Sequence, residues 1–360
     1  CLLVEHGLRS PALYSDVHVY SVYGGNMAKG QIPYRDFFDE YPPLAQPVFL
    51  AARAAGASHY ALVFKWLMAA CGVGALGCAV VTLRALRASL PRAVAGVSVI
   101  ALAPLLAGPI FLNAYDLWPA FLLSLALMLL VLDRPLLAFG VLGAAVAAKV
   151  YPVAVLPIML LYVSSRLRAR AIVTFAAVVV LAHLPFAVLG PGGLRHSYVL
   201  QAKRGLELNS LGSSLLLLAG HPSTANEAPG SLNVTGTTAG VLATLSTLLV
   251  LAAIAASAVA FARGRPLLAS SAAAVAGFVA FDKVFSAQYV DWLVPLAPLA
   301  GVEAAGLTVA VLVLTRAVFS HRTAIAADAN ADVMLLFVRD LAVVALFALL
   351  LLRPKAPDAG

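Results

Sequence analysis

The residues with the clearest capacity for chemistry lie in a polar loop, residues 14–43, near the start of an otherwise hydrophobic chain. Asp16, in the segment SDVHVY, has no lysine or arginine beside it to neutralise its charge. Tyrosines, glycines and paired prolines surround this aspartate, and ordering such a segment costs about 1–2 kcal/mol of conformational entropy per residue. Because ordered polar loops often carry binding and catalytic residues, we interpret residues 14–43 as the active-site loop of a membrane enzyme.

Two lysines stand at the ends of apolar stretches. Lys149 lies in AAKVYPV between two such stretches, and Lys283 lies in FDKVFSAQYVDW at another apolar boundary. Ionisable residues in these positions usually face a cavity instead of lipid. We therefore expect both lysines, together with Lys203 and Arg204, to receive an anionic headgroup. The alternative is that a boundary lysine reaches lipid phosphates through its flexible stem.

The composition indicates the class of protein. Apolar residues make up 62% of the 360 residues and charged residues only 11%, against about 25% charged in a soluble domain. The mean hydropathy is +0.96. At about 20 apolar residues per helical span, the chain has room for roughly ten to twelve spans and for no separate soluble domain. The apolar runs lack the period-2 alternation of a transmembrane barrel, which predicts an all-α polytopic integral membrane protein.

The arginines orient the predicted spans. They gather in short connections between apolar runs, which marks those connections as cytoplasmic. The groups, with the tail lysine, are Arg84, Arg87 and Arg92; Arg134; Arg166, Arg168 and Arg170; Arg263 and Arg265; and Arg353 with Lys355. Topology thus explains most of the net charge of +8, and we expect membrane lipids and no nucleic acid as partners.

Counting between these groups predicts about eleven visible transmembrane helices. They are expected near residues 59–83, 93–111, 117–132, 136–148, 152–164, 172–189, 236–261, 267–281, 290–302, 305–318 and 333–352. The extracytoplasmic segments are then 1–58, 112–116, 149–151, 190–235, 282–289 and 319–332. We divide the chain into an extracytoplasmic catalytic loop with short helices, residues 1–58, and a transmembrane helical domain, residues 59–360, which includes the extracytoplasmic loop 190–235.

Some of these helices are short for full spans. They form two pairs, 136–148 with 152–164 and 290–302 with 305–318, and we expect broken or tilted helices whose turns enter the membrane. Such turns are tolerated where the backbone is buried in protein or lines a cavity. The chain begins at Cys1 with no Met and no visible signal peptide. Because the topology places its first residues outside, we expect a membrane helix to precede them.

Six segments in a fixed order resemble one enzyme family. They are SDVHVY, GQIPYRDFFDEYPPL, NAYDLWP, AAKVYPVAVLP, FDKVFSAQYVDWLVPL and a last helix opening FVRD. Together they are similar to the polyprenol-phosphate-dependent mannosyltransferases of glycosyltransferase family 87, of the actinobacterial type, which have the multi-span GT-C fold. The likeness covers nearly the whole chain. In that family the catalytic loop follows the first membrane helix, which is the helix expected ahead of Cys1.

The resemblance implies an inverting transfer of one sugar, mannose in this family, from a polyprenyl-phosphate donor to a hydroxyl of a lipid or glycan acceptor. The reaction is expected on the extracytoplasmic face of the plasma membrane. A positioned carboxylate that removes the acceptor proton accelerates such a step about 10²–10⁴-fold. Asp16 matches the family's catalytic aspartate and is the candidate general base. Alternatively, Ser15 or Asp16 caps a helix beginning at Val17, and the two roles are compatible.

Departure of the lipid phosphate needs positive charge or hydrogen bonds on its oxygens. A nucleotide-sugar enzyme often recruits a divalent metal through an aspartate pair; at Asp16 this loop instead reads Asp-Val-His, so we expect a cationic site without a metal or another cofactor. Its candidate residues are Lys149, Lys283, Lys203 and Arg204, with Gln288 and Tyr289 as hydrogen-bond donors. The primary lysine stays open, and Lys149 and Lys283 fit the family pattern best.

Further substrate contacts are expected around Asp16 and at the outer ends of later helices. The candidates are His18, Tyr20, Glu40, Tyr41, Tyr151, His321 and Arg322. Asp116 could be a helix N-cap or a site residue. Arg35 could brace the loop by pairing with Asp36, Asp39 or Glu40.

Two other classes of protein stay open. A transporter or flippase for lipids or sugars of the cell envelope would also show broken helices and intramembrane charges. Against it, no inverted repeat is evident and the ionisable residues gather on one face. A non-catalytic assembly protein would have no need of Asp16. The sugar is open as well, because arabinofuranose or another polyprenyl-linked sugar would require the same base and the same phosphate site.

Overall fold

The computed structural model describes residues 16–220, 224–228, 231–326 and 330–353. The membrane helix expected ahead of the chain lies outside these residues. Contacts divide the chain into two compact units: unit 1 comprises Cys1–Ser89 and Ile100–Lys203, and unit 2 comprises Leu90–Val99 and Arg204–Gly360. The helix α5 (Leu90–Ala107) contributes to both units. The proposed division at residue 58 stays a prediction.

The described residues are largely helical and apolar. Six helical stretches among them are long and apolar enough to cross a membrane: Ala57–Ala85, Leu90–Ile110, Ser165–Leu189, Thr237–Ala262, Val302–His321 and Ala331–Leu352. Shorter apolar helices are Leu117–Val131, Pro135–Ala148, Tyr151–Tyr162 and Leu267–Phe281. These elements confirm the predicted all-α polytopic membrane protein.

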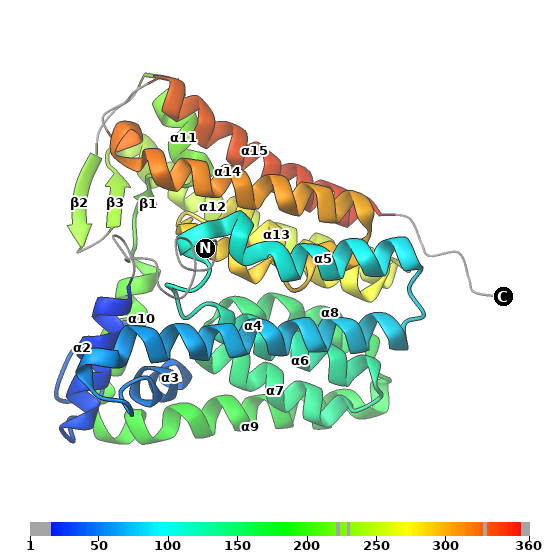
Figure 1. Ribbon diagram of the computed structural model, residues 1–360, viewed down its shortest axis with the longest axis horizontal. Coiled ribbons are helices and arrows are strands. Elements are labelled where there is room, and N and C mark those ends of the chain that lie inside the picture. Colours follow the sequence, from blue (N-terminus) through cyan, green and yellow to red (C-terminus); the bar gives the residue numbers. More distant parts are fainter. Residues whose placement is uncertain (1–15, 221–223, 229–230, 327–329, 354–360) are drawn as a thin grey trace. The chain divides into compact units, whose positions relative to one another are not determined.

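Unit 1 is built around four neighbouring helices. Its elements are α2 (Val17–Ala28), η1 (Pro43–Ala45), α3 (Gln46–Ala51), η2 (Ala57–His59), α4 (Tyr60–Ala85), η3 (Gly108–Ile110), α6 (Leu117–Val131), α7 (Pro135–Ala148), η4 (Tyr151–Val155), α8 (Leu156–Tyr162), α9 (Ser165–Leu189) and α10 (Pro191–Ala202). The helices α4, α6, α7 and α9 lie side by side (Figure 1). Gly143 of α7 faces the Phe175 carbonyl of α9, so a small residue permits close helix packing.

Unit 2 surrounds one buried helix. Its elements are β1 (Leu206–Glu207), α11 (Leu211–Leu218), β2 (Thr224–Ala228), β3 (Ser231–Val234), α12 (Thr237–Ala262), α13 (Leu267–Phe281), η5 (Ala287–Trp292), η6 (Ala297–Ala300), α14 (Val302–Ala326) and α15 (Asn330–Leu352). The small antiparallel sheet has the order β1-β3-β2, with Leu206 opposite Val234. In α13, Gly277 faces Ala253 of α12 and Phe347 of α15.

Several predicted helices differ from the observed ones. The expected helix 290–302 is instead the two 3₁₀ turns η5 and η6, because Pro295 and Pro298 lack the N–H that a continuous helix needs. A broken or tilted helix was expected here and near 152–164, where the 3₁₀ turn η4 precedes the short α8. The expectation that 305–318 is short was wrong: α14 continues to Ala326, into the segment 319–332 that was predicted as a loop.

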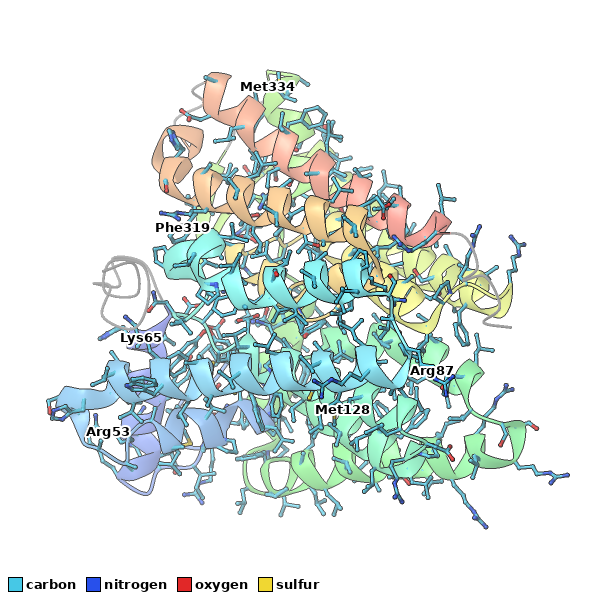
Figure 2. All side chains as sticks on the ribbon, turned by 45° about the vertical axis from the view of Figure 1, so that its right-hand side comes forward. Arg53, Lys65, Arg87, Met128, Phe319 and Met334 are labelled. Atoms are coloured by element: carbon cyan, nitrogen blue, oxygen red, sulfur yellow. The ribbon has the colours of Figure 1, made fainter. Side chains whose placement is uncertain are left out.

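The helix α4 has a charged residue near its beginning and another beyond its end. Figure 2 shows Lys65 near its beginning and Arg87 beyond its opposite end. Lys65 is only 3% exposed although it lies in a candidate membrane span. Its side chain therefore packs inside the protein and not against lipid, as expected for an ionisable residue within a span.

Candidate active site

The polar loop after α2 is held in shape by its own hydrogen bonds. The hydroxyl of Tyr34 donates to the carbonyl oxygen of Tyr41. Asp39 Oδ1 accepts a hydrogen bond of 2.9 Å from the Tyr41 N–H. Arg35 pairs with Asp36 at 2.8 Å, which selects one of its three expected partners. The loop is therefore an ordered element of unit 1.

The loop is also fixed to the helices beneath it. The indole Nε1 of Trp118, in α6, donates to the Leu44 carbonyl at 3.0 Å. Tyr34 has a positive φ of 65°, and its backbone lies against Gly190 and Gly193 at the junction of α9 and α10. A Cβ on Gly193 would overlap the Tyr34 carbonyl oxygen. The close approach of loop and helix therefore depends on these glycines.

Gly193→Ala is accordingly expected to displace the loop, lower the thermal midpoint and reduce activity. Overpacking of this kind costs about 1–3 kcal/mol. The matched control is Gly192→Ala, because no atom lies within 4 Å of a Cβ built on Gly192. Thermal unfolding and activity in detergent or nanodiscs measure both variants. Equal behaviour of the two variants would contradict this close approach.

Asp16 begins α2, but its side chain makes no cap hydrogen bond. Instead, Asp16 Oδ2 accepts a hydrogen bond of 3.3 Å from the hydroxyl of Tyr20, one helical turn later. The side chain of Asp16 is partly exposed, whereas Tyr20 is fully buried. The capping alternative for Asp16 is therefore not supported, and its carboxylate is oriented by a phenol.

An aromatic cluster positions that phenol. Tyr20 stacks on Phe49 with ring centroids 4.5 Å apart and meets the edges of Tyr41 at 5.4 Å and Tyr115 at 5.7 Å. Burial raises the pKa of Tyr20 well above its usual value, and the carboxylates of Asp16 and Asp116 raise it further. Tyr20 therefore stays protonated and able to donate, within electrostatic reach of two carboxylates.

The second carboxylate belongs to an ion pair. Lys149 Nζ lies 2.6 Å from Asp116 Oδ1 and 4.8 Å from the centroid of the Tyr115 ring. Asp116 is fully buried, while the Lys149 side chain is 16% exposed. Asp116 starts α6 without a side-chain cap bond. It is thus a partner of Lys149 and not a cap, and Lys149 faces this aromatic cluster.

Two further acids lie beside the cluster. Gln201 of α10 has its Nε2 3.4 Å from Glu40 Oε2, which links the helix to the loop. The neighbouring Asp39 is fully buried. Desolvation raises the pKa of Asp39 to about 7, and the hydrogen bond from the Tyr41 N–H opposes this rise.

A pH dependence of stability follows from Asp39. Its pKa is higher in the folded state than in the unfolded state, so the folded state binds the proton more tightly and loses stability as pH rises from about 4 to about 7. Asp39→Asn keeps an acceptor for Tyr41 and removes the charge. The thermal midpoint of this variant relative to wild type should therefore increase across that window and level off above pH 7. A constant difference across the window would contradict the buried, protonated acid.

Four of the remaining phosphate-site candidates, Arg204, Lys283, Gln288 and Tyr289, lie in unit 2, whereas Lys203 is the last residue of unit 1. The Glu207 N–H donates to the Lys283 carbonyl at 2.8 Å, which joins β1 to the segment after α13. Glu207 is buried; its burial raises the pKa of this carboxyl, and the Arg204 guanidinium opposes that rise. Two expected cations, Arg204 and Lys283, therefore belong to backbone segments that are hydrogen-bonded to each other.

Gln288 and Tyr289 lie in η5, a few residues beyond Lys283, and are partly exposed. Tyr289 stacks on Trp292 with centroids 3.9 Å apart and on Phe285 at 6.4 Å. This stacking fixes the ring of Tyr289, so the segment offers an oriented hydroxyl close in sequence to Lys283.

Other predicted residues lie on or at the ends of α2, η4, α10 and α14. His18 is exposed on α2, and Lys203 is exposed at the end of α10. His321 is exposed on α14, where its Nδ1 lies 2.8 Å from Asp332 Oδ1. Tyr151 is buried. The side chain of Arg322 lies outside the described residues.

Sequence reasoning missed three residues that contact the expected ones: Tyr115, Gln201 and Glu207. It also missed Arg339, which lies on the ring of Phe285. Arg339 gave a usable signal, since an ionisable residue inside an apolar helix indicates a functional role. For the others no local pattern exists, because each contact joins distant parts of the chain. No group of three or more His, Cys, Asp or Glu residues in the described part of the chain is arranged to hold a metal ion.

The fold resembles solved structures of one enzyme. Two crystal structures of ArnT from Cupriavidus metallidurans, in the apo state and bound to undecaprenyl phosphate, match with TM-scores of 0.52 and 0.50. Each is 13% identical; the match covers 94% of this chain and 72% or 73% of theirs. The likeness shows the GT-C fold. No curated protein sequence is a significant match.

The sequence profile described as glycosyltransferase family 87 matches residues 38–286, more than half of the chain. The matched region includes the loop around Glu40 and Tyr41, the Asp116–Lys149 pair and Lys283. This protein is a membrane glycosyltransferase that belongs to glycosyltransferase family 87.

Proposed function

We propose that this protein transfers a sugar, mannose by family expectation, from a polyprenyl-phosphate donor to a hydroxyl of a glycolipid or glycan, with inversion at the anomeric carbon. One observation carries the proposal: the partly exposed Asp16 stands at the start of α2 and is oriented by the buried phenol of Tyr20. The structure of ArnT with undecaprenyl phosphate supports a donor of this class.

In the proposed reaction, Asp16 takes the proton of the acceptor hydroxyl. The acceptor oxygen forms a bond to the anomeric carbon while the bond from that carbon to the phosphate oxygen breaks. Polyprenyl phosphate leaves with the bonding electrons, and the glycoside forms with inverted configuration. The hydrogen bond from Tyr20 holds the Asp16 carboxylate in place for this transfer. General-base assistance of this kind contributes about 10²–10⁴ in rate.

Cations stabilise the charge that develops on the departing phosphate. We assign the primary phosphate contact to Lys283, because the hydrogen bond from the Glu207 N–H joins its segment to the one that bears Arg204, and the donors Gln288 and Tyr289 follow it in η5. Lys149 and Lys203 supply additional positive charge.

The acceptor is proposed to lie along the polar loop. Tyr41 belongs to the aromatic cluster around Tyr20, and the preceding residue Glu40 is held by Gln201. His18 is exposed on α2, the helix that Asp16 begins. His321 and Arg322 are further candidates. We place these groups on the extracytoplasmic face of a multi-pass plasma-membrane protein, where a lipid-linked donor makes a soluble nucleotide sugar unnecessary.

Liposomes that contain the purified protein and labelled polyprenyl-phosphate mannose distinguish transfer from transport. With a phosphatidylinositol mannoside or lipoglycan acceptor, we expect label in a new glycoside that is resistant to mild acid. Movement of intact donor between leaflets, with no new glycoside, would instead identify a flippase and overturn the proposal.

A further inference from the structure

Arg339 is buried inside the apolar helix α15, with 1% of its side chain exposed. Burying a guanidinium in such a position costs free energy unless protein atoms accept hydrogen bonds from its N–H groups. Its Nε donates to Asp340 Oδ1 at 2.9 Å, and its Nη2 donates to the Asn209 carbonyl at 2.7 Å. The guanidinium of Arg339 therefore contacts protein atoms on two sides.

The face of the same guanidinium lies on an aromatic ring. Arg339 Cζ is 3.8 Å from the centroid of Phe285. The Phe285 ring stacks on Tyr289 with an interplanar angle of 16°, and Tyr289 stacks on Trp292 at 23°. The guanidinium of Arg339 and the rings of Phe285 and Tyr289 are thus stacked in series. Tyr289 is one of the proposed hydrogen-bond donors to the lipid phosphate.

Asn209 and Phe285 belong to the two segments that carry the unit 2 cations, 204–210 and 282–289. These segments are also joined directly by the hydrogen bond from the Glu207 N–H to the Lys283 carbonyl. The hydroxyls of Ser210 and Ser213 both donate to the Glu207 carbonyl at 2.7 Å. The backbones that bear Arg204 and Lys283 are therefore held together, with Arg339 contacting both.

We propose that Arg339 is a positioning residue for the polyprenyl-phosphate site, acting through Asn209 and Phe285 on the segments that carry Arg204, Lys283 and Tyr289. This inference rests on the proposed function. Without the guanidinium, the two segments keep only the Glu207–Lys283 hydrogen bond as their described direct link, their side chains shift relative to one another, and the lipid phosphate loses matched contacts. The acceptor, bound along the loop of unit 1, is unaffected.

Phe285→Leu tests this role without leaving a buried charge unpaired. Loss of a cation–π contact corresponds to a change of roughly 2- to 30-fold. We expect the Kd for undecaprenyl phosphate and the KM for the donor to rise about tenfold, while the KM for the acceptor stays constant. Hydrogen exchange in 204–210 and 283–289 should accelerate. The control is Phe281→Leu, whose ring contacts Phe347 at 5.5 Å and which should leave both donor constants unchanged.

A second variant removes the guanidinium itself. Because Arg339→Met alone would strand the buried Asp340 carboxylate, it is combined with Asp340→Asn. The double variant should show the same rise in donor constants and in local exchange. Adding Phe285→Leu to it should have little further effect, because both changes remove one coupled interaction.

These measurements distinguish a positioning role of Arg339 from a role limited to the stability of the protein. A role limited to stability would lower the active fraction, and hence kcat, while leaving the donor Kd and both KM values constant; that result overturns the proposal. Equal donor constants and equal exchange for Phe285→Leu and Phe281→Leu also overturn it. If the wild type binds undecaprenyl phosphate without transferring sugar, the proposed reaction fails, while binding and exchange still decide the role of Arg339.

Discussion

Asp16→Asn is expected to lower kcat by about 10²–10⁴ while leaving the affinity for the lipid donor close to that of wild type. Asparagine has the size of aspartate and keeps a carbonyl oxygen that can accept the hydrogen bond from Tyr20. It cannot take a proton from the acceptor hydroxyl. The orientation of the side chain is thus retained and only the general base is lost, so single-turnover transfer measured at saturating donor reports the chemical step.

Asp133→Asn serves as the control. Asp133 is exposed in the connection between α6 and α7, with a φ of 57° that asparagine also adopts. This variant should transfer sugar at the wild-type rate. Unchanged single-turnover transfer by Asp16→Asn would remove Asp16 from the proposed chemistry.

Lys283→Met is the second substitution with a large expected effect. Removing a fixed cation from a developing charge in a desolvated site typically costs about 10²–10³ in rate. We expect a loss of this size in kcat/KM for the donor, with a thermal midpoint near that of wild type, because Lys283 is partly exposed. The control Lys29→Met removes an exposed lysine at the end of α2 and should have no comparable effect.

The assignment of Lys283 over Lys149 is tested in the same assay. Since Lys149→Met would leave Asp116 as a buried, uncompensated charge, the useful comparison is Lys149→Met combined with Asp116→Asn. A smaller loss than that of Lys283→Met supports the assignment. A larger loss at equal stability would transfer the primary role to Lys149.

Hydropathy predicted the fold well because a membrane span needs a long apolar segment, and the chain provides such segments in order. Helix continuity was harder to predict. Pro295 and Pro298 break the apolar stretch before α14, whereas α14 itself continues through a polar segment to Ala326. Its last residues were assigned to a loop because polarity there was interpreted as an end of the helix.

The sequence indicated individual candidate residues of the site, but it did not predict the contacts between them. Asp16 stood out as an acid in a polar loop with no cation beside it, and Lys149 as a charge at an apolar boundary. The Asp116–Lys149 pair joins residues 33 positions apart, and the Arg339–Asn209 bond joins residues 130 positions apart. No local periodicity encodes such contacts, since packing of distant segments creates them. Tyr20 is fully buried and donates to Asp16, and its expected contact with sugar stays a prediction.

The central claim is that the sugar comes from a lipid phosphate. The most direct test supplies the protein, in nanodiscs with an acceptor, with labelled polyprenyl-phosphate mannose or, separately, with GDP-mannose. If the proposed reaction is correct, one polyprenyl phosphate is released for each sugar transferred from the lipid donor, and no sugar is transferred from the nucleotide. Transfer from GDP-mannose alone, or a glycoside formed without release of polyprenyl phosphate, would contradict it.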